Sequence, residues 1–495
     1  MRELKVKVLK RIDMKVQIHA AQRLLEDQHE KLATHRGHIL VLGFGGVGQS
    51  ILPVILRHLD VSPSAVVVLD KEVRPEFAKY EDLGVTYVHR EIVKSNLVPT
   101  LNELLSPGDL LINVSLNIDG LEIVEWCLQN NVLYIDTSIE RWATEPDEII
   151  PELGERTLYT THQEMRRMAS AYPGASTCVV THGANPGLVS HFVKAALLKL
   201  AKDTGLKTGT PESQEQWGML AEALNVKIIQ TAERDTQILK EPKRVNEFVN
   251  TWSCEGFWAE GRAPAEMGWG THEKEIPADG KELAGGSVLY LEQPGVETTV
   301  KSWVPLGGTF NGYLIQHSEA ITISEYFSTE NYRPTCYYAY QPCDAAIASV
   351  HEMKGQELWM HRKTRIAKNS IQSGIDELGV LLLGHERNAL WYGSQLSIEE
   401  SRELVEGQNA TTLQVVGSML GAIVWMLDNP NQGYCEPEDL PFEFVLNIAS
   451  PFLGPIAAVY SDWTPLAHAN RELYDDEHDD SDVWAFSNFR TDSGL

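Results

Sequence analysis

Short apolar runs and helical stretches alternate along the first third of the chain. The apolar runs lie in HILVLGFGGVGQS, AVVVLDKE, VTYVHRE, DLLINVS and VLYIDTS, and stretches such as LEIVEWCLQNN separate them. Buried strands that alternate with amphipathic helices are typical of a parallel, doubly wound sheet. We therefore predict a Rossmann-type α/β domain over residues 36–185, with ligands at the carboxyl ends of its strands.

A different pattern follows over residues 186–405. The stretch GLVSHFVKAALLKLAKDTG repeats apolar residues at helical spacing and contains Gly205, a helix-stop signal. Beyond it lie short aromatic-rich strands and glycine turns, as in VKIIQTAERDTQ, SVLYLEQPG and GYLIQHSEAITISEYF. Such strands predict a second, α+β domain built on a largely antiparallel sheet.

The two ends of the chain differ from both domains. TTLQVVGSMLGAIVWMLDNP is helical and apolar nearly all round, so we expect residues 406–470 to form a helical return that packs on the first domain. YDDEHDDSD predicts a solvated acidic tail over residues 471–495. Residues 1–35 are basic, lack the apolar core of a secretory signal, and are expected to be a poorly ordered extension.

Composition limits the environment and the partners. No apolar run approaches the ~20 residues of a membrane span, which favours a soluble, cytoplasmic protein. The net charge of -27 repels nucleic acid and anionic membranes and attracts polycations, although it also serves solubility alone. The six cysteines form no CxxC pair, so we expect reduced thiols and neither a disulfide framework nor a metal site.

A glycine motif predicts a nucleotide site. Gly43, Gly45, Gly46, Val47 and Gly48 lie in a GxGxxG pattern that follows an apolar strand and opens a helix. Such glycines allow a tight turn and the close approach of a pyrophosphate to a helix N-terminus.

Residues of the following strands add to this prediction. Asp70 ends the next strand, where a carboxylate would bond a ribose 2′-hydroxyl and repel a 2′-phosphate, so NAD is favoured over NADP. Asn113, Ser115 and Thr137 end later strands and are further candidates for cofactor contact. The alternative is a glycine turn in an unrelated fold, with polar residues that only make turns.

Two further stretches combine structural and chemical signals. In THGANPG, Asn185 and Pro186 suit the N-cap and first position of the helix that follows, yet they also lie where a ligand site is expected. NTWSCEGFWAEG sets indoles beside carboxylates. If this stretch is extended, Trp252, Trp258 and Glu260 share one face, either as a half-buried strand or as a cage for a cation.

Several blocks together resemble one enzyme family. THGANPG, TAERDTQ, NTWSCEGFWAEG, MGWGT, RPTCYYAYQPC, GIDELGVLL, WYGSQLSIEE and DWTPLA are similar to the bacterial homospermidine synthases, within the saccharopine dehydrogenase-like group. The resemblance runs from about residue 36 to Trp484. It implies a homodimeric, NAD-dependent transferase that makes homospermidine from two putrescines, or from spermidine and putrescine, without net redox change.

The resemblance also implies a set of catalytic residues. These are Glu140, Asn185, Glu233, Trp252, Glu260 and His317. Trp252 would supply a cation–π face beside Glu260, while Glu233 and Glu140 would anchor ammonium groups. His317 and Asn185 would assist proton transfer and imine orientation, since an ordinary histidine titrates near neutral pH.

One position departs from the family pattern, and two other functions are alternatives to the one that the resemblance implies. Asn117 stands where the family tends to have an acid, with Asp119 two residues later, and neither is placed in the catalytic set. A saccharopine- or carboxynorspermidine-type dehydrogenase is an alternative, but its carboxylate substrates call for an arginine in the site. A non-catalytic scaffold that binds NAD or polyamines is a second alternative.

Overall fold

The structure is a computed structural model that describes residues 31–143, 151–467 and 481–491. It divides into two units. Unit 1 takes the described parts of residues 1–150, 161–188 and 396–455, and unit 2 takes residues 151–160, 189–395 and 456–495. The chain therefore returns to unit 1 ten residues earlier than expected, and residues 456–495 belong to unit 2 rather than to the helical return. Of the predicted N-terminal extension, residues 1–30 lie outside the described residues. Its last residues are ordered, because Ala33–Thr34 forms a strand that pairs with Leu59–Asp60, so the prediction of a poorly ordered extension up to residue 35 is wrong there.

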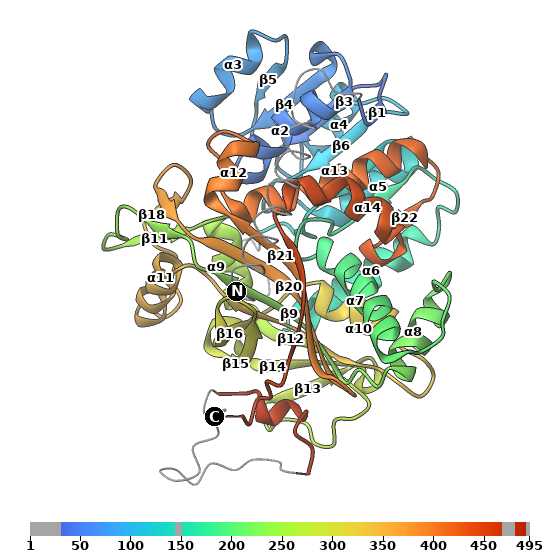
Figure 1. The fold of residues 1–495 in the computed structure, drawn as a ribbon. Coiled ribbons are helices and arrows are strands. Elements are labelled where there is room, and N and C mark those ends of the chain that lie inside the picture. The colour runs from blue at the N-terminus through green and yellow to red at the C-terminus, as the bar shows by residue number, and fades with distance from the viewer. Residues whose placement is uncertain (1–30, 144–150, 468–480, 492–495) are drawn as a thin grey trace, which may run out of the picture. The chain divides into compact units, whose positions relative to one another are not determined.

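Unit 1 is built on a parallel sheet of seven strands (Figure 1), in the order β22-β8-β7-β6-β2-β4-β5. Every recorded strand pair in this sheet is parallel, which confirms the predicted Rossmann-type fold. The strands of unit 1 are β1 (Ala33–Thr34), β2 (Ile39–Leu42), β3 (Leu59–Asp60), β4 (Val66–Asp70), β5 (Thr86–His89), β6 (Leu110–Asn113), β7 (Leu133–Asp136), β8 (Cys178–Val179) and β22 (Tyr434–Cys435).

The helices of unit 1 come from the segments of the chain before and after most of unit 2. They are α2 (Gly46–His58), α3 (Ala78–Glu81), α4 (Leu97–Leu104), α5 (Gly120–Asn130), α6 (Leu158–Ala169), α12 (Ile398–Leu404), α13 (Ala410–Asp428) and α14 (Phe442–Ala449). Helix α13 is long and apolar enough to cross a membrane, yet 83% of its apolar window is buried within the protein. It shares one core cluster with α2 and β2, so its apolar residues are explained by core packing.

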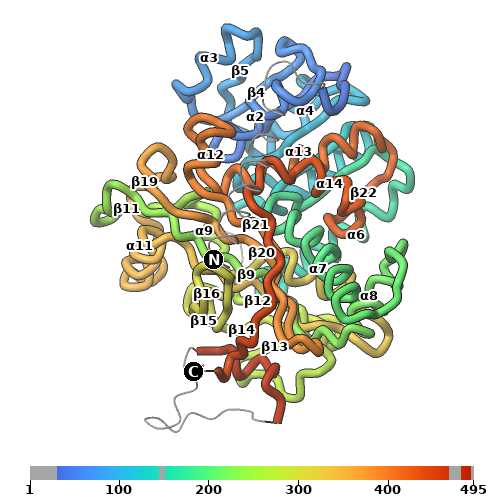
Figure 2. The backbone as a smooth tube through the Cα atoms, in the orientation of Figure 1, coloured from blue at the N-terminus to red at the C-terminus, as the bar shows by residue number. Residues whose placement is uncertain are grey.

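Unit 2 is built on a mixed, mainly antiparallel sheet. Its central path is β13-β14-β12-β17-β9-β20-β21-β23, and β16 pairs with both β17 and β15. The pair formed by β17 and β9 is parallel, while the remaining recorded pairs of this sheet are antiparallel. Figure 2 shows the chain path through these strands. The prediction of a largely antiparallel second domain is confirmed.

The elements of unit 2 have the following bounds. The strands are β9 (Ile228–Asp235), β10 (Ile238–Leu239), β11 (Glu247–Asn250), β12 (Pro264–Gly268), β13 (Gly280–Leu283), β14 (Val288–Pro294), β15 (Thr299–Val304), β16 (Gly308–Ile315), β17 (Thr335–Gln341), β18 (Lys363–Ile366), β19 (Ile371–Ser373), β20 (Ile375–His385), β21 (Asn388–Ser397) and β23 (Ile456–Ser461). The helices are α7 (Leu188–Thr204), α8 (Gln214–Ala223), α9 (Cys254–Arg262), α10 (Glu319–Tyr326) and α11 (Asp344–Gly355).

The tryptophan-rich stretch is helical, which corrects the extended reading. Helix α9 covers Cys254–Arg262, and the Ser253 side chain caps it by accepting a hydrogen bond from the Gly256 amide at 2.9 Å. Serine at the N-cap satisfies one of the amides that a helix start leaves unbonded. Trp258 and Glu260 therefore lie on a helix, so alternation along a strand no longer places them on one face.

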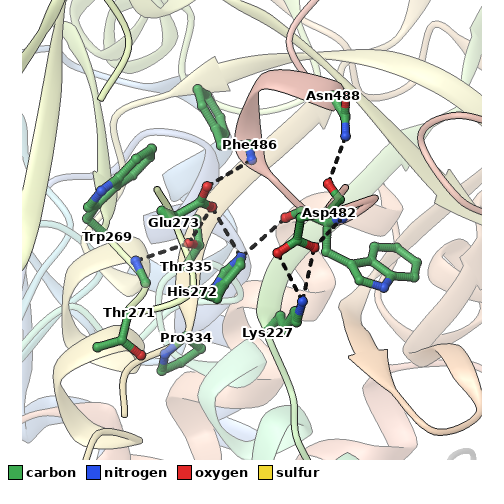
Figure 3. A network of polar contacts seen from close by, with 12 residues as sticks. Lys227, Trp269, Thr271, His272, Glu273, Pro334, Thr335, Asp482, Phe486 and Asn488 are labelled. Carbon is green, nitrogen blue, oxygen red and sulfur yellow. Dashed lines mark hydrogen bonds and ion pairs between the residues drawn. The ribbon is translucent and has the colours of Figure 1, made fainter. Parts of the chain in front are cut away.

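Part of the predicted acidic tail packs into unit 2. Residues 471–480 and 492–495 lie outside the described residues, but Phe486 and Phe489 are buried in the core of the sheet. In Figure 3, Glu273 accepts hydrogen bonds from the Phe486 amide at 3.0 Å and from Thr335 Oγ1 at 2.8 Å. The aromatic residues of WAFSNF, directly after the acidic run, explain why this segment packs instead of remaining solvated.

Candidate active site

The glycine loop of unit 1 has the geometry of a dinucleotide site. Gly43 adopts a φ of 99°, and a Cβ there would meet the Val114 carbonyl oxygen at 2.7 Å. At Gly48 a Cβ would overlap the Gly43 carbonyl, so α2 packs closely on the loop. A Cβ on Gly45 would meet nothing within 4 Å, which leaves open space in front of the backbone at the start of α2. This is the approach that a pyrophosphate requires.

Asp70, at the end of β4, is fixed against this loop. Its Oδ2 accepts a hydrogen bond from the Phe44 amide at 2.6 Å, and its Oδ1 accepts one from the Glu72 amide at 2.8 Å. The side chain is only partly buried. A partly exposed carboxylate beside a glycine loop has the chemistry expected for a ribose diol contact.

The other predicted cofactor residues lie along the carboxyl edge of the sheet. Asn113 pairs in register with Asp136 across β6 and β7, and Thr137 follows directly. Asn113 Oδ1 accepts a hydrogen bond from Ser115 Oγ at 2.6 Å. The edge is therefore lined by ordered polar side chains, as a ligand-binding edge of an α/β sheet requires.

Beneath this edge lies a buried carboxyl group that the sequence did not suggest. Tyr134 Oη donates to Asp136 Oδ2 at 2.7 Å and accepts from Asn113 Nδ2 at 3.1 Å. The Thr181 amide donates to Asp136 Oδ1 at 2.5 Å. Burial raises the pKa of Asp136 to about 7, because it outweighs the opposing effect of these hydrogen bonds.

The loop that carries Asn185 is closed on itself. Its Gly183 amide donates to the Pro186 carbonyl at 2.7 Å, and the Leu188 amide donates to the Gly183 carbonyl at 3.0 Å. Helix α7 begins at Leu188, so Asn185 is not its N-cap and Pro186 is not its first residue. Of the two alternatives for these residues, helix capping is wrong, because both lie within the turn that precedes the helix.

Glu140 occupies the next loop after β7. Its carboxylate accepts hydrogen bonds from Ser138 Oγ at 3.1 Å and from the Asn117 amide at 3.3 Å. Asp119 is the N-cap of α5, accepting hydrogen bonds from two amides, and it pairs with Arg141 at 3.0 Å. Asp119 therefore has a structural role, while Asn117 contacts Glu140 through its backbone alone among the interactions described.

In unit 2, Glu233 lies on one face of the central strands with two tyrosines. Tyr340 is its in-register neighbour across β9 and β17, and Tyr338 lies two residues earlier on the same face. Tyr338 Oη donates to Glu233 Oε2 at 2.6 Å, and Glu233 is 2% exposed. Burial, followed by the Glu233 charge, raises the pKa of Tyr338 well above 10, so this phenol remains a donor.

Trp252 joins this group through Tyr340. Its Nε1 donates to Tyr340 Oη at 3.0 Å, and the Tyr340 ring stacks on Tyr338 with centroids 5.2 Å apart. A Cβ on Gly256 would meet the Trp252 ring at 3.1 Å, so the indole can lie against α9 because this position is glycine. The hydrogen bond of Nε1 to Tyr340 and the contact of the ring with Gly256 together fix the orientation of the indole.

His317 completes the group between two carboxylates. Its Nε2 lies 3.1 Å from Glu260 Oε2, and its Nδ1 lies 3.1 Å from Glu319 Oε2. Burial alone would lower the pKa of His317, but the two carboxylates outweigh burial and raise this pKa well above 6.5. The expectation that His317 titrates near neutrality is therefore wrong for the protein without substrate, because both ring nitrogens face acids.

Comparison with known proteins matches two family domains, one after the other along the chain, and the second of them includes the returning segment 396–455 of unit 1. The saccharopine dehydrogenase NADP binding domain matches residues 39–180, and the saccharopine dehydrogenase C-terminal domain matches residues 183–460. A homospermidine synthase from Blastochloris viridis is 43% identical over 467 residues, which cover 91% of this chain and 97% of that protein. The chain belongs to the homospermidine synthase family.

Other members of the homospermidine synthase family agree. The enzyme from Mesorhizobium japonicum is 41% identical over 468 residues, covering 91% of this chain and 96% of its own. The crystal structure of the Legionella pneumophila homospermidine synthase, in complex with NAD, superimposes with a TM-score of 0.86 at 40% identity. That match covers 92% of this chain and 98% of the other.

The family resemblance had indicated four unit 2 residues, and the structure brings all four into one connected group. It adds Tyr338, Tyr340 and Glu319, which sequence reasoning missed. The i, i+2 spacing of the two tyrosines in YYAYQ was an available signal, since alternate strand residues share a face. Among the described residues, Glu319 Oε1 is buried without a hydrogen-bond partner, so it remains able to accept one. No group of three or more metal-ligand side chains occurs within residues 31–143, 151–467 and 481–491.

Proposed function

We propose that this protein is an NAD-dependent homospermidine synthase, which joins two putrescines and releases ammonia, or uses spermidine with putrescine. The observation that supports this most is the unit 2 group, in which His317 contacts two carboxylates and the Tyr338 ring, and Tyr338 in turn links Glu233, Tyr340 and Trp252. Carboxylates and an aromatic face suit alkylammonium groups and not carboxylate substrates. The group therefore favours a polyamine over the substrates of saccharopine-type dehydrogenases.

NAD is the proposed cofactor of unit 1. The residues fit it, because the Gly45 backbone is open and the Asp70 carboxylate lies beside the loop. A carboxylate there bonds a ribose diol and repels a 2′-phosphate, which favours NAD although the matching domain family is named for NADP. When bound, NAD accepts a hydride from the substrate carbon and returns it later. We propose that Gly43, Gly46, Val47, Gly48, Asn113, Ser115 and Thr137 contact it.

The unit 2 residues hold the amine substrates. Trp252 offers its ring face to an alkylammonium, which gains roughly 0.5 to 2 kcal/mol from such a contact. Glu233 and Glu260 anchor ammonium groups, and the open Oε1 of Glu319 adds an acceptor. Because Tyr338 and Tyr340 fix Glu233 and Trp252, these side chains need little rearrangement when a substrate binds.

Proton transfer and imine orientation fall to His317 and Asn185 in this proposal. Loss of a hydride from a putrescine C–N carbon gives an imine, to which the free amine of the second diamine adds. The former imine nitrogen then takes a proton and leaves as ammonia, and the new imine receives the hydride. An ammonium that binds Glu260 or Glu319 weakens their hold on the His317 proton, so the histidine can donate it to the leaving nitrogen. Asn185 orients the imine nitrogen, and Glu140 anchors an ammonium.

The function is tested with putrescine and a trace of NAD⁺. Homospermidine and ammonia are expected in equal amounts, in excess over cofactor, without accumulation of NADH. Stoichiometric NADH with no longer polyamine would instead establish a dehydrogenase. Binding of NAD and putrescine without any turnover would establish a scaffold. Glu260→Gln is expected to lower kcat/KM at least about tenfold, while Glu255→Gln, an exposed position on the same helix, serves as its control.

Assembly and location are also proposed from the family. We infer a homodimer, and a monomeric mass by light scattering would contradict this. We infer a cytoplasmic protein, because all six cysteines are free and buried, as suits a reducing compartment. A disulfide detected by mass spectrometry of protein taken directly from cells would contradict that inference.

A further inference from the structure

Asp136 is a buried carboxyl group with no part in the chemistry proposed above. Its side chain is held in unit 1 between the carboxyl edge of the sheet and the loop 181–187, and the residue is 1% exposed. Burying an acid is costly, and burial raises the pKa of Asp136 to about 7 although the hydrogen bonds of Tyr134 and Thr181 and the charge of His162 act in the opposite direction. Because burial of the Asp136 carboxyl group is unfavourable, we looked for the interactions that it stabilises.

The conformation of Thr181 shows what the carboxyl group holds. Thr181 adopts a φ of 52°, a left-handed conformation that β-branched residues rarely take. Its amide donates to Asp136 Oδ1 at 2.5 Å, and the next amide, that of His182, donates to the Asp136 carbonyl at 2.8 Å. The Thr181 hydroxyl is buried without a hydrogen-bond partner among the described residues. The bonds to Asp136 therefore compensate an unfavourable backbone.

The same carboxyl group is linked to the cofactor edge. Donors and acceptors run in one direction, from Ser115 Oγ to Asn113 Oδ1, from Asn113 Nδ2 to Tyr134 Oη, and from Tyr134 Oη to Asp136 Oδ2. On the other side, Thr181 begins the loop that closes through Gly183 and Pro186 around Asn185. Asp136 thus connects predicted cofactor contacts with a predicted catalytic residue of the same unit.

We propose that Asp136 is a positioning residue that fixes the loop 181–187, and with it Asn185, relative to the cofactor edge of the sheet. Its influence on catalysis rests on the proposed function, whereas its influence on the loop does not. The bond to Thr181 keeps the left-handed turn, so loss of the carboxyl group lets the loop relax and moves Asn185 from its working position.

Steady-state kinetics test whether Asp136 influences catalysis. In Asp136→Ala, kcat for homospermidine formation is expected to fall at least about tenfold, with the Kd for NAD⁺ changed by less than about threefold. Asp136→Asn retains an acceptor for the Thr181 amide and should recover most of kcat. Asp136→Ala with Thr181→Gly should recover at least about threefold over Asp136→Ala, because glycine adopts the left-handed turn without strain.

A matched control separates positioning from stability. Asp109 is also a buried carboxylate bonded to backbone amides of unit 1, those of His38 at 2.6 Å and Ser106 at 2.7 Å, but it precedes β6 at the amino edge of the sheet. Asp109→Ala should lower Tm yet leave kcat per folded enzyme within about twofold. An equal loss of kcat in Asp109→Ala and Asp136→Ala, or an unchanged kcat in Asp136→Ala, would overturn the proposal.

Hydrogen exchange tests the loop without any turnover. The backbone amides of the loop 181–187, apart from Pro186, should exchange at least about tenfold faster in Asp136→Ala than in the wild type or in Asp109→Ala. If the wild type makes no homospermidine, the proposed function fails while this measurement still decides the loop. If Asp136→Ala is not recovered folded, Tyr134→Phe decides. It keeps the Asp136 carboxyl group but removes the Tyr134 Oη donor to Asp136 Oδ2, together with the acceptor of Asn113 Nδ2. Unchanged exchange of the loop amides and unchanged kcat in Tyr134→Phe would overturn the proposal.

Discussion

Glu436 is expected to anchor the returning C-terminal segment to unit 1 and to make acid stability depend on one carboxylate. It lies directly after β22 and at the start of the short 3-10 helix η6 (Pro437–Asp439). Four donors converge on it: His162 Nδ1 at 3.0 Å, Arg166 Nε at 2.9 Å and Nη2 at 2.7 Å, and Tyr434 Oη at 2.8 Å. Replacing it with glutamine removes the charge and keeps the shape.

The magnitude follows from its pKa. Burial opposes ionisation of Glu436, but the bonds and charges of His162 and Arg166 outweigh burial and lower its pKa from 4.5 to about 2. At ~1.36 kcal/mol per pKa unit, this corresponds to about 3 kcal/mol of stability at neutral pH. Because the folded-state pKa is the lower one, this stability is present above pH 4.5 and is lost as pH falls toward 2.

Urea unfolding followed by circular dichroism measures the effect. Glu436→Gln should lower the free energy of unfolding by about 3 kcal/mol at pH 7, and the deficit should narrow by about 2 kcal/mol by pH 3. Glu443→Gln, an exposed position on α14, should change it by less than about 0.5 kcal/mol. A Glu436→Gln deficit below about 1 kcal/mol at pH 7, or one that stays constant with pH, would refute the reasoning.

Three further outcomes are expected. Trp252→Phe should lower kcat/KM for putrescine about 3- to 30-fold, whereas Trp258→Phe, whose Nε1 bonds the Leu358 carbonyl at 2.9 Å, should lower it less than about twofold in steady-state assays. Asp70→Ser should raise the ratio of NADP to NAD affinity at least about tenfold in fluorescence titrations, because the repelling charge is gone. His317 has a raised pKa, so the stability it contributes is complete below pH 6.5 and is lost as pH rises through its folded-state value. The Tm advantage of the wild type over His317→Gln should therefore shrink in alkaline buffers, and a constant difference would contradict the charged imidazole.

The sequence was sufficient for the main architecture because hydrophobic period and glycine spacing act locally. Apolar runs in β2, β4, β6 and β7 needed no knowledge of distant residues, and the Gly43 turn follows from its motif. Strand β22 shows the limit. Only two residues long, it joins the sheet beside β8, and no local pattern in the sequence indicates this partner.

The sequence pattern led to a wrong prediction where both a strand and a helix are compatible with the same residues. The indoles at positions 252 and 258 are compatible with strand alternation, but the Ser253 side chain caps and so stabilises a helix over Cys254–Arg262. His317 shows a second limit, since its raised pKa depends on Glu319 and on Glu260, and Glu260 is distant from it in sequence. Thr181 shows a third, because a left-handed β-branched residue is stable only through a partner, and that partner is Asp136.

Charge balance gives a reason for the particular composition of the unit 2 group. With Glu233, Glu260 and Glu319 formally ionised and His317 protonated, these four side chains carry a net charge of -2. A diamine with two ammonium groups carries the opposite charge, so its binding neutralises a buried acidic group that is otherwise costly to maintain. Oxidation of the diamine first requires that one nitrogen lose its proton, which restores a negative charge to the group. That charge again stabilises the protonated His317, so the amine becomes reactive while the proton needed by the leaving ammonia stays in the site. A neutral residue at position 317 would remove this coupling, even if every carboxylate still bound its ammonium.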